Sequence, residues 1–167
     1  MILTIYTSTE RMLTMSRKSC FLIGHREVSE KIYPALYAAI EEHITRYGVT
    51  EFMVGRYGSF DRLVVKAVKI AKQSHPEVEL TLLLPYHPAE RPIPVPDGFD
   101  STYYPPGMER YPQGCYCPGK SVYSRSYRFS HCLCVAPYQQ RKRSSGICKE
   151  EEGKGFIRVT ALPHNDF

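Results

Sequence analysis

Strand-like and helix-like patterns alternate along residues 20–84, and this alternation constrains the fold more than any other feature of the sequence. Cys20–Gly24 (CFLIG) and Glu51–Gly55 (EFMVG) are short apolar runs that end in glycine and are typical of buried parallel strands. A third run, Val78–Leu84 (VELTLLL), has the same character. Two β–α–β units in succession require parallel strands joined by right-handed crossovers. The sequence therefore predicts an α/β fold, a Rossmann-like parallel sheet with flanking helices.

Amphipathic helices are predicted between these strands. The first covers about residues 30–47, and Ser29 is a suitable N-cap for it. The second covers residues 59–74 and is opened by Ser59 or Asp61. The inward-facing residues recur at helical spacing. They are Ile32, Leu36, Ile40 and Ile44 in the first helix, and Leu63, Val64, Ala67, Val68 and Ala71 in the second.

The chain of 167 residues has the length of one domain, which we place at residues 16–162. Residues 1–14 lack the layout of a signal peptide, and we expect the extension at 1–15 to be disordered or strand-like. Met15 begins the more coherent sequence MSRKSCFLIGH, so we expect it to be the natural start. Residues 163–167 form a tail. No stretch approaches the roughly 20 consecutive apolar residues of a membrane span. We therefore expect a cytoplasmic protein with no membrane partner.

The region after the third strand is predicted to be mostly loop. Nine of the thirteen prolines fall between Pro85 and Pro118, so this part of the chain should be extended and irregular. An apolar run at Gly155–Leu162 (GFIRVTAL) predicts a last strand.

Three loops that follow the predicted strands carry the candidate site residues. In open parallel sheets, ligands bind beyond the carboxyl ends of the strands, where these loops should meet. Glycines let the backbone approach a ligand closely, and the amides at a helix start attract phosphate. The candidates are Gly24, His25 and Arg26 in the first loop, Gly55, Tyr57, Gly58, Ser59 and Asp61 in the second, and Pro85 and Tyr86 in the third.

Each candidate also has a purely structural interpretation. The glycines can be tight turns, His25 can be a hydrogen-bonded loop residue, and Asp61 can complement the dipole of the second helix. Arg26 and Arg56 can be solvated. The position that the three loops share favours the binding interpretation over these. The loops match neither the dinucleotide-binding glycine fingerprint nor a phosphate-binding Walker loop.

Three motifs are notable, namely I-G-H-R at residues 23–26, G-R-Y-G-S-F-D at residues 55–61 and Y-P-P-G-M-E-R at residues 104–110. Together they resemble the small bacterial proteins of the SLOG superfamily, which are Rossmann-like relatives of DprA and of the LOG (lysine-decarboxylase-like) proteins. The resemblance covers about residues 16–112 and 153–162. It implies a parallel sheet with a pocket for a nucleotide or a nucleotide-derived ligand. LOG-type enzymes carry P-G-G-x-G-T-x-x-E, which is absent here.

We therefore expect a binding or sensing role rather than catalysis, with no cofactor. Arg26 and the amides around residues 55–60 would hold the phosphate, Tyr57 and Tyr86 would pack the nucleoside, and Asp61 or His25 would hydrogen-bond its polar edge. The alternative is an enzyme that hydrolyses the N-glycosidic bond of a nucleoside monophosphate, with Asp61 as the acid/base. The sequence leaves a homo-oligomer open.

Residues 111–149 differ in composition from the rest of the chain. They contain seven basic residues, no acidic residue and five of the six cysteines. Outside this window the chain has 15 basic and 17 acidic residues, so the net charge of +5 arises here. A background with few cysteines suits a reducing compartment.

We interpret residues 114–148 as the product of a shifted reading frame. One permitted choice of codons for residues 114–149, read one nucleotide later, encodes a helix, an apolar strand and a helix start, which resemble the family's sequence in this place. The C-terminal part of the sheet should then be disrupted, with Cys132–Ala136 as a substitute strand. The resemblance of the sequence to the family resumes at about residue 153.

The other interpretation of this window is a zinc- or nucleic-acid-binding module that uses residues 115–143. Cys115, Cys117, Cys132 and Cys134 could surround a zinc ion, but zinc sites usually have wider cysteine spacing. The basic cluster at residues 141–143 lacks an aromatic platform. We therefore expect neither a metal ion nor a nucleic-acid partner.

Overall fold

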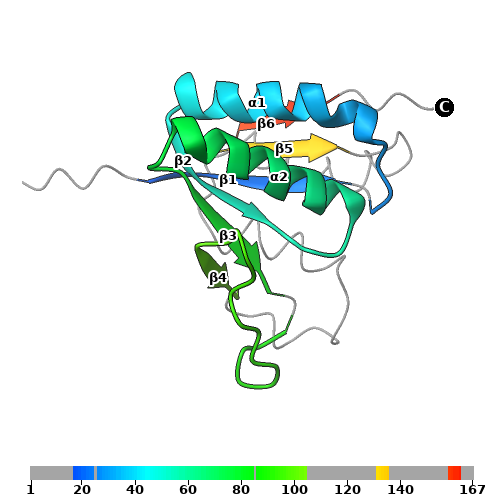
Figure 1. Ribbon diagram of the computed structural model, residues 1–167, viewed down its shortest axis with the longest axis vertical. Helices are drawn as coiled ribbons and strands as arrows, with labels where there is room; N and C mark the ends of the chain where they lie inside the picture. The colour runs from blue at the N-terminus through cyan, green and yellow to red at the C-terminus, as the bar shows by residue number, and fades with distance from the viewer. Residues whose placement is uncertain (1–16, 25, 85, 105–130, 136–157, 163–167) are drawn as a thin grey trace, which may run out of the picture.

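The computed structural model describes residues 17–24, 26–84, 86–104, 131–135 and 158–162. The described strands form one parallel sheet, in the order β4-β3-β2-β1-β5-β6 (Figure 1). The predicted Rossmann-like α/β fold is thereby confirmed. The strands are β1 (Lys18–Gly24), β2 (Val49–Val54), β3 (Glu79–Leu83), β4 (Ser101–Tyr103), β5 (His131–Val135) and β6 (Arg158–Ala161).

Strand β1 lies in the interior of the sheet. It pairs with β2 on one side, where Cys20 is opposite Phe52, and with β5 on the other, where Cys20 is opposite His131. On one side of β1 lie β2, β3 and β4, in chain order toward the edge of the sheet. On the other side of β1 lie β5 and then β6. The order of strands therefore reverses at β1, which is the arrangement that creates a ligand-binding crevice in doubly wound sheets.

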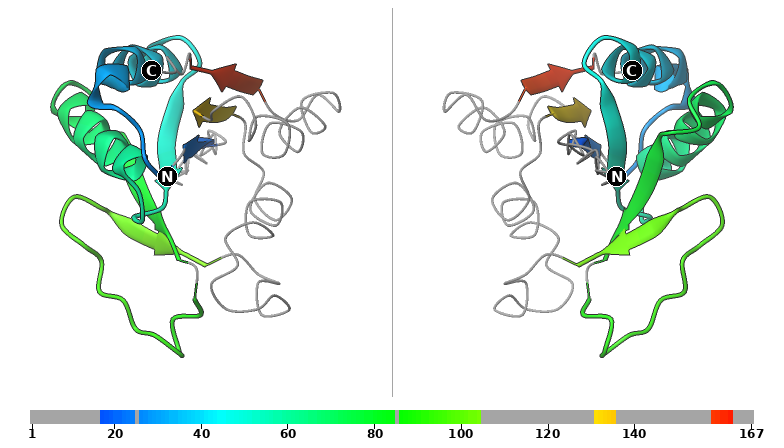
Figure 2. Two further views of the ribbon diagram at one scale, coloured as in Figure 1. Left: turned by 90° about the vertical axis from the view of Figure 1, so that its right-hand side faces the viewer. Right: turned by 90° about the vertical axis from the view of Figure 1, so that its left-hand side faces the viewer.

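The described helices are the 3₁₀-helix η1 (Glu30–Ile32), α1 (Tyr33–Thr45) and α2 (Ser59–Ser74). Both α-helices cover the same face of the sheet (Figure 2). This follows from two right-handed crossovers that advance in the same direction, from β1 to β2 and from β2 to β3. Each helix starts at the edge of the sheet toward which the strand arrows point (Figure 1).

The predicted helix over residues 30–47 begins with a 3₁₀ turn. The Ser29 hydroxyl accepts a hydrogen bond from the Lys31 amide, as its prediction as a cap requires. The α-helical part starts at Tyr33, because Pro34 in its first turn has no amide hydrogen to donate. At the other end, Gly48 adopts a φ of 68° and its amide bonds to the Ile44 carbonyl.

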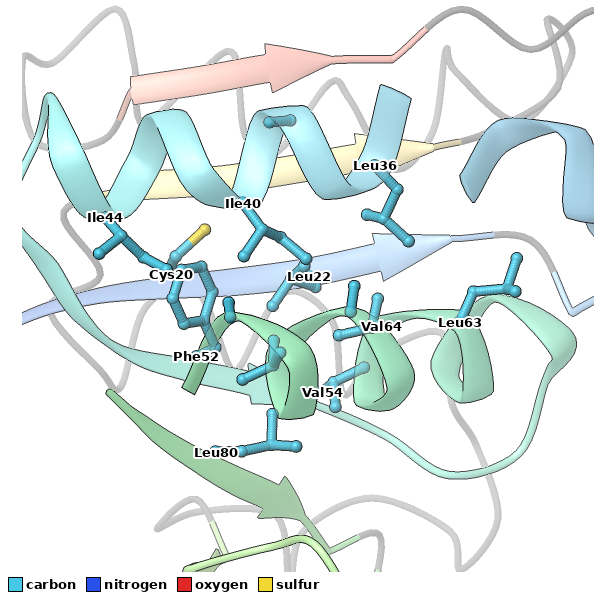
Figure 3. Close-up of a cluster of buried hydrophobic side chains, with 14 of the residues drawn as sticks. Cys20, Leu22, Leu36, Ile40, Ile44, Phe52, Val54, Leu63, Val64 and Leu80 are labelled. Carbon is cyan, nitrogen blue, oxygen red and sulfur yellow. The ribbon is translucent and has the colours of Figure 1, made fainter. Parts of the chain in front are cut away.

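The main core lies between the two α-helices and the sheet (Figure 3). All the predicted inward-facing helix residues are buried. They pack against side chains from one face of the strands, namely Cys20, Leu22, Phe52, Val54 and Leu80. The residues that alternate with these, Phe21, Ile23, Met53 and Leu83, are also buried, as expected for parallel strands with both faces covered.

Strand boundaries differ from the predictions by one to three residues. The first two strands begin two residues before the apolar runs, and the last begins at Arg158 rather than Gly155. The predicted substitute strand is present as β5 and pairs with β1. The rest of the window at 114–152, the extension at 1–15 and the tail at 163–167 lie outside the described residues.

The described residues after Pro85 are mostly loop, as predicted, but they include one short strand that was not predicted. Ser101–Tyr103 forms strand β4, which pairs with β3 at the edge of the sheet. Its position is fixed by Asp100, whose carboxylate accepts a hydrogen bond from the Leu80 amide at 2.7 Å and whose own amide bonds to the Leu80 carbonyl. A strand of three residues after five prolines carries almost no periodic signal.

Candidate functional site

The loops after β1 and β2 meet at the carboxyl edge of the sheet and line an open pocket of about 480 Å³. The first loop contributes residues 26–29, the second contributes residues 56–58, and the first turn of α2 contributes Ser59 and Arg62. The predicted meeting of the first two loops therefore agrees with the geometry. The role of their residues as ligand contacts stays a prediction.

Ser59 joins the two loops. Its hydroxyl oxygen accepts a hydrogen bond from the Val28 amide at 2.7 Å and lies 3.0 Å from the Arg26 carbonyl, to which it can donate. The Ser59 amide also donates to the Arg26 carbonyl at 2.8 Å. A serine at the first position of α2 thus holds the loop after β1 against the end of the loop after β2.

Gly58 allows this close contact between the loops. It is the N-cap of α2 and has an extended backbone. A Cβ atom at this position would lie 2.9 Å from the Cα of Arg26, closer than real Cβ atoms come, and 3.0 Å from its carbonyl oxygen, which is a tight contact. Glycine here serves the approach of two backbones, whereas the sequence suggested the approach of a ligand.

Asp61 caps the helix from its third position. One of its carboxylate oxygens accepts hydrogen bonds from the Tyr57 amide at 2.8 Å and from the Gly58 amide at 3.2 Å. A carboxylate at this position satisfies amides at the helix start and complements the helix dipole. This is the structural role that the sequence suggested for Asp61 as the alternative to ligand binding. These amides were expected to hold a phosphate, and a carboxylate of the chain itself already occupies them.

Three guanidinium groups line the pocket. Arg26 and Arg56 extend from the two loops, and Arg62 extends from the first turn of α2. All three side chains are exposed, and none forms an ion pair with a carboxylate of the residues that the structure describes. Glu27 is the acidic residue in the lining. The pocket therefore has a positive potential and unsaturated hydrogen-bond donors that suit an anion.

Tyr57 stands at the same pocket with 44% of its surface exposed. A tyrosine ring at this place is suited to cover a flat group held beside the arginines. Tyr86 does not line this pocket, and its ring lies 5.0 Å below the guanidinium of Arg91. The third predicted loop thus contributes no described residue to the lining. His25 and Pro85 lie outside the described residues.

Arg62 was missed by the sequence analysis, and Glu27, Val28 and Ser29 were not considered as pocket residues. Arg62 could have been found from helical geometry. It lies three residues after Ser59 in an amphipathic helix whose inner face contains Phe60, Leu63 and Val64, so it is expected on the outer face in the first turn.

In the part of the chain that the structure describes, no three histidine, cysteine or acidic side chains gather as metal ligands do. The cysteines at 115 and 117 lie outside that part, and those at 132 and 134 lie on β5. No described helix is long and apolar enough to cross a membrane. No family model matches the chain, and no curated protein matches it.

Proposed function

We propose that the pocket binds a nucleotide or nucleotide-derived small molecule, in a binding or sensing role. The observation that carries the proposal is the group formed by Arg26, Arg56 and Arg62 around an open pocket, without carboxylate partners among the described residues. Exposed guanidinium groups that converge from separate elements suit a multivalent anion such as phosphate. The location at the carboxyl ends of parallel strands is where α/β sheets bind ligands.

The phosphate would be held by side chains more than by the helix start. The amides of Tyr57 and Gly58 donate to Asp61, and the amide of Ser59 donates to Arg26. The guanidinium groups are then the principal donors for the anion. Tyr57 would cover the base or the ribose, since a tyrosine ring stacks well on flat groups.

Membership of the SLOG superfamily is part of the same proposal. It rests on the three motifs named above and agrees with a parallel sheet in which β1 lies inside. Two of the motifs, at residues 23–26 and 55–61, supply the loops that line the pocket. The third, at residues 104–110, lies almost wholly outside the described residues.

The test is a titration of the protein with adenosine 5′-monophosphate, adenosine and inorganic phosphate by isothermal calorimetry. The monophosphate should bind and adenosine should bind more weakly. Arg56→Ala should weaken the binding of the monophosphate by about 10- to 100-fold, because a hydrogen bond to a charged group contributes roughly 1.5–3 kcal/mol. Absence of binding by every nucleotide tried would refute the proposal.

Arg46→Ala is the matched control for this experiment. It removes the same charge and the same side chain, but Arg46 follows the last turn of α1, at the opposite edge of the sheet. Its guanidinium pairs with Glu42, and its side chain is 69% exposed. The affinity of this variant for the monophosphate should be unchanged, so a loss in Arg56→Ala alone would be due to the pocket.

The enzymatic alternative gains no support from the described residues. The carboxylate of Asp61, its acid/base candidate, accepts two backbone hydrogen bonds at the start of α2. Incubation with nucleoside monophosphates, followed by chromatography for free base, separates the two functions. Binding without release of base supports the sensing role.

A further inference from the structure

We propose that Asp61 is a positioning residue for the ligand: it holds the loop at residues 55–58 so that Arg56 and Tyr57 stand at the pocket, without touching the ligand. The inference rests on the proposed function and deepens it. It assigns to Asp61 a role other than the ligand contact or acid/base that the sequence suggested.

The geometry of the loop leads to this role. After β2 ends at Val54, the chain turns through four residues before α2 begins at Ser59. The carboxylate of Asp61, on the helix, accepts hydrogen bonds from this turn at the amides of Tyr57 and Gly58. The first of these amides belongs to the peptide that joins Arg56 to Tyr57. Its bond to a carboxylate on a rigid helix fixes the direction in which both side chains leave the backbone.

The two loops are held by different residues of the same helix turn. Ser59 holds the loop after β1 at the Arg26 carbonyl and the Val28 amide. Asp61 holds the loop after β2 at the amide that follows Arg56. The effect of Asp61 on the ligand should therefore pass through Arg56 and Tyr57 and leave Arg26 in place.

The sign of the effect distinguishes this role from a simple charge effect. A carboxylate close to an anion site repels the ligand, so its removal should strengthen binding if charge alone matters. If Asp61 positions the loop, its removal should weaken binding although the pocket becomes more positive. Asparagine is the decisive variant, because its amide oxygen can accept the same backbone hydrogen bonds without the charge.

The experiment measures the binding of adenosine 5′-monophosphate to the full chain and to its Asp61→Ala, Asp61→Asn, Arg56→Ala and double variants. Asp61→Ala should weaken binding roughly tenfold, the equivalent of one lost charge-assisted hydrogen bond. Asp61→Asn should bind at least as well as the original chain. In an Arg56→Ala background, Asp61→Ala should have a much smaller effect than alone, whereas in an Arg26→Ala background its effect should persist.

A second measurement keeps the test independent of the alanine variant's stability. Amide hydrogen exchange of Tyr57 and Gly58 should be slow in the original chain and in Asp61→Asn, and faster in Asp61→Ala. The inference fails if Asp61→Ala binds as tightly as the original chain or more tightly, or if Asp61→Asn loses as much affinity as Asp61→Ala. If the original chain binds no nucleotide, the proposed function itself fails, and the inference falls with it.

Discussion

Ser59 and Gly58 show how single residues bring the two loops of the pocket together. Neither contributes a charge, and both act through the backbone of Arg26, which Ser59 bonds and Gly58 closely approaches. The sequence identified both residues as candidate ligand contacts, and Ser59 also as a possible start of the second helix. It could not show that the hydroxyl and amide of Ser59 already form hydrogen bonds with the loop after β1, because those bonds depend on how two separate loops are placed.

Gly24 provides a test of packing at the end of β1. A Cβ atom added there would overlap the ring of Phe60, which is fully buried in the first turn of α2. Gly24→Ala should therefore destabilise the fold by about 1–3 kcal/mol, the usual cost of overpacking. Urea unfolding followed by circular dichroism measures this loss.

A smaller partner ring or side chain should relieve the overlap. Gly24→Ala should cost less in a Phe60→Ala background than in the original chain, because alanine lacks the Cγ and Cδ atoms that the new methyl group would overlap. Equal costs in the two backgrounds would show that the overlap with Phe60 is not the cause. Gly24 would then be required for another reason.

At the scale of elements, the position of β4 beside β3 depends on the carboxylate of Asp100. Lys72 on α2 contacts both oxygens of Asp100 at 2.6 Å, and the Leu80 amide donates to one of them at 2.7 Å. Partial burial of Asp100 opposes its ionisation, but the hydrogen bonds from Lys72 and Leu80 and the lysine charge prevail and lower the pKa of Asp100. The ionised form is therefore stabilised in the folded protein.

This depressed pKa predicts a loss of stability in acid. The contribution of Asp100 is fully present above the pKa of about 3.9 of an unfolded aspartate and disappears as the pH falls through the lower folded pKa. Asp100→Asn should reduce the free energy of unfolding at pH 7 by about 1 kcal/mol or less, because the side chain is 37% exposed. The difference between the two proteins should shrink below about pH 4.

Urea unfolding between pH 3 and pH 7 measures this difference. Asp97→Asn, an exposed carboxylate three residues earlier, makes the same change of charge and should leave stability nearly unchanged. A difference between the original chain and Asp100→Asn that stays constant down to pH 3 would show that ionisation of Asp100 does not stabilise the fold.

The elements themselves were largely predictable up to β3. Helix α2 has the predicted bounds because Leu63, Val64 and Ala67 recur at helical spacing and His75-Pro76 ends it. The strand ends were less accurate because Lys18 and Val49 lie in the sheet by pairing with each other, which no local pattern reveals. Strand β4 was missed for the same reason, since its position comes from Asp100 and Leu80.

At the scale of the whole molecule, the sequence predicted the parallel sheet but not the order of its strands. The order follows from which strand pairs with β1, and β5 takes the side opposite β2. The predicted pocket of three loops became a pocket of two, because β3 lies one strand farther from β1 and its loop contributes no described lining residue. Distance across a sheet is a property of topology that loop composition does not encode.

The origin of residues 114–148 is the last prediction, and it concerns the chain as a whole. The six-stranded sheet includes His131–Val135 as β5 beside β1, so this window supplies one strand of the sheet even though its composition differs from the rest. A parallel strand inside a sheet is usually a continuous apolar run that buries both faces. The sequence HCLCV meets this requirement only in part, because it is short and begins with histidine.

If the window is read from a shifted frame, the gene should show it directly. The nucleotides of codons 114–149, read one base later, should encode a helix, a longer apolar strand and a second helix start without a stop codon. The restored strand should bury more apolar surface at about 25 cal/mol per Å², so a chain that carries it should unfold at higher urea concentration than the present one. A stop codon, or a sequence without these patterns, would show that the present residues are the natural ones and that β5 is their native strand.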